Sequence, residues 1–60
     1  MFKVEIKTSG AAYSEDDVIT YEGRLELKRN LEYISRKIDE GYDDGVIMDI
    51  NGNKVGSWSL

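Results

Sequence analysis

The sequence has no cysteine, no histidine and no proline among its 60 residues. The lack of cysteine and histidine excludes disulfides, a thiolate nucleophile, an imidazole base and an ordinary zinc site. A chain of this size hides only about 60% of the surface that it exposes when unfolded. Small domains usually add disulfides, a metal ion or self-association to so thin a core, and the composition removes the first two. We expect a single domain over residues 1–60.

Positive charge is also scarce, because eight Lys and Arg stand against 12 Asp and Glu and give a formal net charge of −4. Binding of phosphates needs a concentrated basic surface, so direct contact with nucleic acid is not expected. No stretch approaches the ~20 apolar residues of a membrane span, and the alternating N-terminal residues are not typical of a signal peptide. We therefore expect a cytoplasmic protein that contacts no membrane.

The first 21 residues contain one clear strand. Apolar and charged side chains alternate over residues 2–8, which is typical of a half-buried strand. Residues 9–17 form a connection with a local acidic cluster. Residues 18–21 fit a short strand, a loop or the start of a helix with Thr20 as its N-cap, and these alternatives stay open.

The spacing then predicts one amphipathic helix from about residue 21 to 40. Its apolar residues recur at intervals of four, three and four, within one narrow stripe: Leu27, Leu31, Ile34 and Ile38. We expect this stripe to be the helical side of the core. Gly41 stands where a left-handed residue would end the helix. Gly23 in the first turn and Leu25 on the opposite side do not fit the ideal pattern.

Two apolar segments, residues 46–50 and 54–58, flank Asn51-Gly52, which is a strong hairpin signal. A two-residue type I′ turn is predicted. In that register Asp49 faces Lys54 and Met48 faces Val55, an opposite-charge pair and an apolar pair. A bulged or four-residue loop that includes Asn53 is the alternative.

The order of these elements predicts an α+β domain with a three-stranded, mainly antiparallel sheet and one helix packed on one face, in the order β-α-β-β. We place the last strand in the middle of the sheet, because that order needs no parallel pair. A central second strand, which requires a right-handed crossover, is the alternative.

The hairpin also favours a contact surface on the sheet. Four apolar residues of the hairpin are expected to face the helix: Val46, Met48, Ile50 and Val55. Alternation then turns Ile47, Trp58 and Leu60 to the uncovered face. A contiguous apolar patch with tryptophan is typical of protein contact sites, so these three residues are candidate protein-binding residues. The alternative is a register shifted by one residue, which buries Trp58 and Leu60 in the core.

A second candidate surface is acidic. The run from residue 39 to 49 contains no Lys or Arg, and its first four acids are candidate protein-binding residues: Asp39, Glu40, Asp43 and Asp44. A solvated helix end explains this run equally well. No catalytic, cofactor-binding or metal-binding residue is predicted. Residues 49–53 do not match a calcium loop, because their glycine stands in the fourth place.

Three segments together carry a resemblance: Ser9-Gly10-Ala11-Ala12-Tyr13 after the opening strand, the single charged helix, and the ending Asp49-Ile50-Asn51-Gly52-Asn53-Lys54-Val55-Gly56-Ser57-Trp58. They resemble a family of very short uncharacterised proteins from bacteriophages and mobile elements. Gly10 departs from the family's Asn-Ala-Ala-aromatic motif, so no role of that asparagine is carried over. The resemblance implies no activity or ligand, but it implies a genomic setting in which small acidic proteins often bind and inhibit a host protein.

We predict a small non-enzymatic protein-interaction module, an accessory protein of a phage or mobile element that binds a host protein or itself as a homodimer, with no cofactor. The alternative is an acidic nucleic-acid mimic that inhibits a host DNA- or RNA-binding enzyme, of the anti-restriction or anti-CRISPR type. The eight basic residues among the 12 acids count against a mimic, which needs a nearly unbroken negative face.

Overall fold

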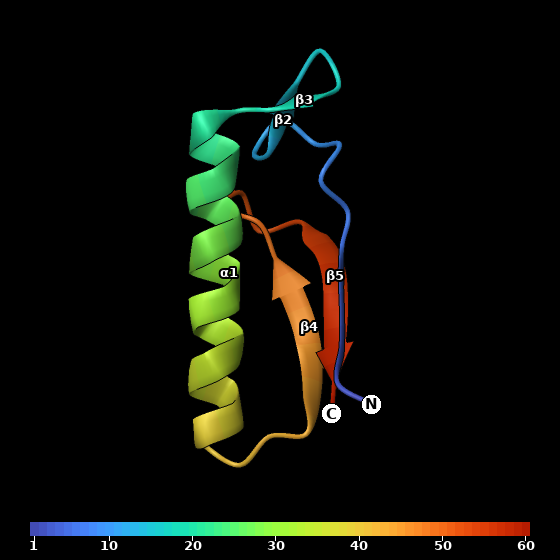
Figure 1. Cartoon of the computed structure of the whole chain (residues 1–60), viewed down its shortest axis with the longest axis vertical. Helices are drawn as coiled ribbons and strands as arrows, with labels where there is room; N and C mark the ends of the chain where they lie inside the picture. Colours follow the sequence, from blue (N-terminus) through green and yellow to red (C-terminus); the bar gives the residue numbers. More distant parts are fainter.

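The computed structural model describes residues 1–60 and combines one helix with two antiparallel sheets (Figure 1). The elements in chain order are β1 Lys3–Ile6, β2 Ser14–Glu15, β3 Val18–Ile19, α1 Tyr21–Asp39, β4 Asp44–Met48 and β5 Lys54–Ser59. The larger sheet has the order β1-β5-β4, and β2 and β3 form a separate hairpin beside the start of α1. The predicted α+β class and the central position of the last strand are confirmed.

The segment that the sequence left open, residues 18–21, is divided between a strand and the start of the helix. Val18–Ile19 form β3, and Asp16 and Asp17 between β2 and β3 have φ angles of 51° and 63°. Two central residues at positive φ are the mark of a type I′ hairpin turn. Thr20 is the N-cap of α1, where its Oγ1 accepts a hydrogen bond of 2.9 Å from the Gly23 amide.

The turn between β4 and β5 differs from the predicted type I′ turn, because only Gly52 has positive φ, at 83°. The Gly52 amide donates to the Asp49 carbonyl at 3.0 Å, and the Asp49 amide donates to the Asn53 carbonyl at 2.8 Å. This pattern is a three-residue loop with a left-handed glycine, the bulged alternative. The Asp49 carboxylate accepts from the amides of Asn51 and Asn53 at 2.9 Å each, which favours this loop over the tighter turn.

The predicted register holds away from the turn and fails beside it. Ile47 pairs with Gly56, but Met48 pairs with Lys54, so the predicted pairs of Asp49 with Lys54 and of Met48 with Val55 are wrong. A bulge between Ile47 and Met48 causes the shift. Val55 is left without a partner in the ladder to β4 and packs against the core instead.

The core lies between α1 and one face of the larger sheet. Its centre is formed by Ile34, Ile47 and Trp58, and Val4, Ile6 and Val55 pack around them. Trp58 lies next to Gly45 across the ladder, and a Cβ added at Gly45 would stand 2.8 Å from the Trp58 Nε1. The missing side chain therefore gives the indole its place under the helix.

Candidate functional site

The apolar stripe of α1 is only partly in the core. Ile34 is 2% exposed, but Leu31 is 53% exposed and Ile38 also reaches solvent. The expectation that the whole stripe forms the helical side of the core is therefore wrong for these two residues. The helix is rotated so that its buried residues are Gly23, Glu26, Asn30 and Ile34.

A buried network of hydrogen bonds fixes the orientation of α1 about its own axis. The hydroxyl of Tyr13, which is fully buried, donates to the Asn30 Oδ1 at 2.8 Å, and the Asn30 Nδ2 donates to the Met48 carbonyl at 3.2 Å. Burial raises the pKa of Tyr13, and the carboxylates of Glu26 and Asp49 raise it further. Because buried polar groups are costly unless they are paired, these bonds link the connection, α1 and β4 in one orientation.

Glu26, the second buried polar residue of the helix, is balanced by Arg29. The Arg29 Nε donates to the Glu26 Oε2 at 3.2 Å, and its Nη2 forms an ion pair with the Oε1. The hydrogen bond to Glu26 raises the pKa of Arg29. The buried side of α1 therefore contains the polar residues Glu26 and Asn30 as well as Ile34. Because this side is turned inward, part of the apolar stripe is left exposed.

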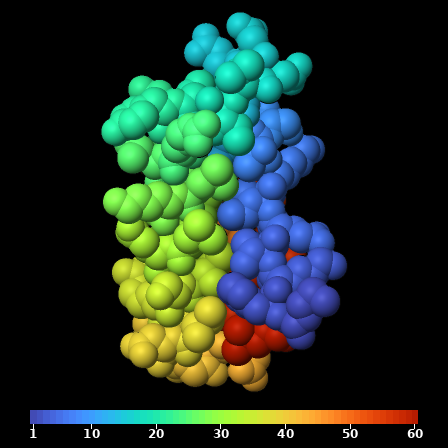
Figure 2. Space-filling model, viewed as in Figure 1, coloured from blue at the N-terminus to red at the C-terminus, as the bar shows by residue number.

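Four exposed residues and the half-buried Leu27 form a continuous surface, here called the helix flank: Phe2, Leu27, Leu31, Ser35 and Ile38. Phe2 is 53% exposed, as is Leu31, and Figure 2 shows the N-terminal residues in blue beside the C-terminal half of the helix in yellow. A hollow of about 220 Å³ lies between Phe2 and the helix, lined also by Leu31, Ile34, Ser35 and Ile38. The flank therefore extends from α1 to the residue before β1.

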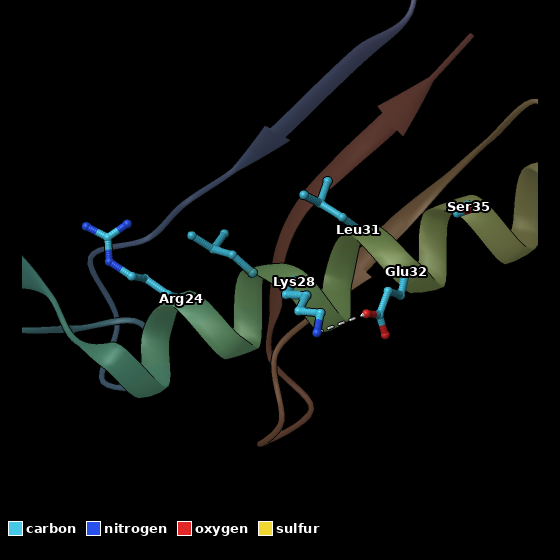
Figure 3. A pocket seen from close by; sticks show the side chains of 6 residues that line it. Arg24, Lys28, Leu31, Glu32 and Ser35 are labelled. Carbon is cyan, nitrogen blue, oxygen red and sulfur yellow. Dashed lines mark ion pairs between the residues drawn. The ribbon is translucent and has the colours of Figure 1, made fainter.

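A second hollow, shallow, open to solvent and lined by α1 residues alone, continues along the helix toward its N-terminus and shares Leu31 and Ser35 with the first. Its charged residues are Arg24, Lys28 and Glu32. Figure 3 shows Arg24 and Leu31 on one side of the helix and Lys28 and Glu32 on the other. Lys28 and Glu32 form an ion pair of 3.9 Å, whereas Arg24 has no ion-pair partner within the chain.

The sheet residues predicted for protein binding are placed differently. Ile47 is 1% exposed and Trp58 is 3% exposed, so the prediction that they form an uncovered face is wrong, and only Leu60 of the three is exposed. Val46, Met48 and Ile50, expected under the helix, are exposed instead. β5 aligns Trp58 with Val4 of β1, and both lie with Ile47 on the face of the sheet that α1 covers. Covering this face buries the large apolar indole, which favours it over the face that carries Val46 and Met48.

The acidic residues Asp39, Glu40, Asp43 and Asp44 are exposed, as a binding surface requires, and their binding role stays a prediction. Positive charge nevertheless lies among them. The Lys37 Nζ is 3.5 Å from a Glu40 carboxylate oxygen and lies over the rings of Tyr33 and Tyr42, at 5.4 and 4.9 Å from their centroids. This lysine interrupts the negative face in space, although it precedes the acidic run in sequence.

The sequence interpretation missed Phe2 and Leu31 as surface residues and Tyr13 and Asn30 as core residues. One signal was available, since Gly23 in the first turn of a helix indicates a close approach by another segment. That segment is the connection, because a Cβ at Gly23 would stand 1.8 Å from the Tyr13 carbonyl oxygen. The close approach turns α1 toward the connection and moves Leu31 away from the core.

Comparison with known proteins adds no assignment: no family model, no curated protein and no solved structure matches the chain. The one helix lacks the length and the apolar character needed to cross a membrane. His, Cys, Asp and Glu side chains form no group of three or more that could hold a metal ion.

Proposed function

We propose that this protein is a non-enzymatic interaction module that binds another protein through the helix flank, in the cytoplasm. The observation that carries the proposal is the exposure of Leu31 and Phe2 on either side of one apolar hollow. Single exposed apolar residues are common on protein surfaces, but contiguous ones mark contact sites. Here Leu31 and Ser35 belong to both hollows, so the exposed residues are contiguous.

The surroundings of the flank have the composition of a contact site. Its centre is formed by leucine, isoleucine and phenylalanine side chains, and Arg24, Lys28 and Glu32 lie at its border. An apolar centre with a charged rim is the usual anatomy of a protein interface. The resemblance to short phage and mobile-element proteins supports the further proposal of an accessory protein.

Site-specific photo-crosslinking tests the proposal. A photoreactive phenylalanine analogue is placed at position 31, on the flank, or at position 25, an exposed leucine on another side of the same helix. Irradiation of cells that express each variant should give protein adducts from position 31 and far fewer from position 25. Equal yields from the two positions, or no adduct from position 31, would contradict binding through the flank.

A further inference from the structure

We propose that the partner on the helix flank is a second copy of this chain, whose α1 packs antiparallel to the first around a two-fold axis near Leu31. The inference rests on the proposed function, since it names the partner for the same flank. Homodimers with two-fold symmetry use the same patch on both copies, so the patch must be complementary to itself.

Four charges on or next to the flank side of α1 meet that requirement, whereas Glu22, Arg36 and Lys37 elsewhere on the helix do not take part. Arg24 and Lys28 lie in the N-terminal half of the helix, and Glu32 and Asp39 lie in the C-terminal half. A two-fold axis at Leu31 places Arg24 opposite Ile38 of the second copy and next to Asp39 of the second copy. Neither Arg24 nor Asp39 has an ion-pair partner within its own chain. The antiparallel dimer pairs Arg24 of each copy with Asp39 of the other, which makes two ion pairs across the contact.

The apolar residues are complementary in the same arrangement. The axis brings Leu31 against Leu31 of the second copy, and Leu27 opposite Ser35, a large side chain against a small one. Side chains of unequal size across a contact allow two helices to interdigitate closely. Phe2, which lies beside Leu31 and Ile38, extends the buried area beyond the helices.

A parallel arrangement of the two helices is disfavoured by the same charges. It would place Arg24 opposite Arg24 and Asp39 opposite Asp39, and like charges in contact oppose association. It would also align the two helix dipoles, whereas the antiparallel arrangement opposes them. Self-association further suits a chain with no disulfide or metal to support its small core.

Charge reversal measured by sedimentation equilibrium tests the dimer. The wild-type chain should sediment as a dimer in equilibrium with monomer, and Arg24→Asp and Asp39→Arg alone should each raise the dissociation constant at least about tenfold. An equimolar mixture of the two variants should dimerise again, because each reversed charge then meets its opposite. Arg24→Asp places a negative charge near the N-terminus of α1 and Asp39→Arg a positive charge at its C-terminus, and the helix dipole favours both. Neither substitution should therefore weaken the helix, and circular dichroism checks this.

Glu15→Arg is the matched control, because it reverses an exposed charge on β2, outside the flank and outside the acidic run, and it should dimerise like the wild type. A wild-type chain that stays monomeric at millimolar concentration would overturn the second-copy proposal. So would a mixture that recovers no more dimer than the separate variants. In either case, heavier adducts from the crosslinker at position 31 would still support binding of a different protein through the flank.

Discussion

At the residue scale, the contact between Gly23 and Tyr13 organises the molecule. A helix interior usually disfavours glycine, yet here any larger residue would collide with the Tyr13 carbonyl, 1.8 Å from the position of a Cβ. The same carbonyl accepts a hydrogen bond of 3.0 Å from the Thr20 amide. One backbone group thus fixes the start of α1 against the connection.

Replacement of Gly23 by alanine should therefore destabilise the protein by more than about 2 kcal/mol, through overpacking against backbone that cannot move. In an exposed helix the same change would stabilise by about 1 kcal/mol. Gly10→Ala is the control, because no atom lies within 4 Å of the added carbon. Thermal denaturation compares the two variants, and an unchanged melting temperature for Gly23→Ala would contradict the close approach.

Tyr13→Phe should cost about 1 to 3 kcal/mol at neutral pH, because the buried Asn30 Oδ1 loses its donor. The raised pKa of Tyr13 adds a pH dependence: the folded state favours the neutral phenol, while the unfolded chain ionises at the ordinary value of 10.0. Stability from this group is full below pH 10 and is lost as the pH rises through the folded pKa.

Urea titrations of the wild type and of Tyr13→Phe across this range give the test. The difference in unfolding free energy between the two proteins should shrink above pH 10. A difference that is constant with pH would contradict the burial of a hydrogen-bonded Tyr13.

At the scale of elements, the sequence predicts where α1 begins and ends but not which side of it is buried. Gly41, at φ 97°, follows the end of the helix as predicted, and Thr20 caps its start, which is one of the alternatives that the sequence leaves open for residues 18–21. The direction of burial depends on tertiary contacts, and here Asn30, a polar residue, faces inward while Leu31 faces out. Apolar periodicity cannot detect a helix face that is buried through hydrogen bonds.

The rotation of α1 predicts unequal effects of truncation at neighbouring positions. Ile34→Ala removes a buried core side chain and should cost about 2 to 5 kcal/mol. Leu31→Ala removes a half-exposed side chain and, measured on the dilute monomer, should cost less than about 1 kcal/mol. Chemical denaturation at low protein concentration measures both, and the reverse ranking would show that the helix is buried on its leucine side.

The hairpin loop should make the stability of the protein depend on pH in the acid range. Hydrogen bonds from the Asn53 backbone, and then from the Asn53 side chain and the Asn51 and Gly52 backbone, lower the pKa of Asp49 from 3.8. Since the folded pKa is depressed, the stabilisation is present above pH 3.8 and is lost as the pH falls through the folded value.

Asp49→Asn should therefore lower the melting temperature at neutral pH, and the deficit should disappear in acid. Asp43→Asn serves as the control, since the Asp43 carboxylate makes no hydrogen bond or ion pair, and it should leave the melting temperature nearly unchanged at either pH. Equal deficits of Asp49→Asn in acid and at neutral pH would contradict the role of the carboxylate in the loop.

At the scale of the whole molecule, the sequence predicts the strand order but not the covered face of the sheet. Residues 46–50 carry apolar side chains on both sides, so alternation alone does not choose between them. The choice depends on β1 and β5, which bring Val4 and Trp58 together on one face. The candidate contact surface moves accordingly, from the sheet to the flank between α1 and Phe2.

The central claim is that the helix flank binds protein while Ile47 and Trp58 form the core of each monomer. Backbone amide chemical shifts, followed by nuclear magnetic resonance as the wild-type chain is diluted, test it most directly. The account predicts concentration-dependent shifts at Phe2, Leu27, Leu31, Ser35 and Ile38. It predicts unchanged signals at Val46 and Ser57 on the uncovered face of the sheet. Shifts confined to the sheet would contradict it. So would the absence of any shift, both on dilution and on addition of a partner protein identified by crosslinking at position 31.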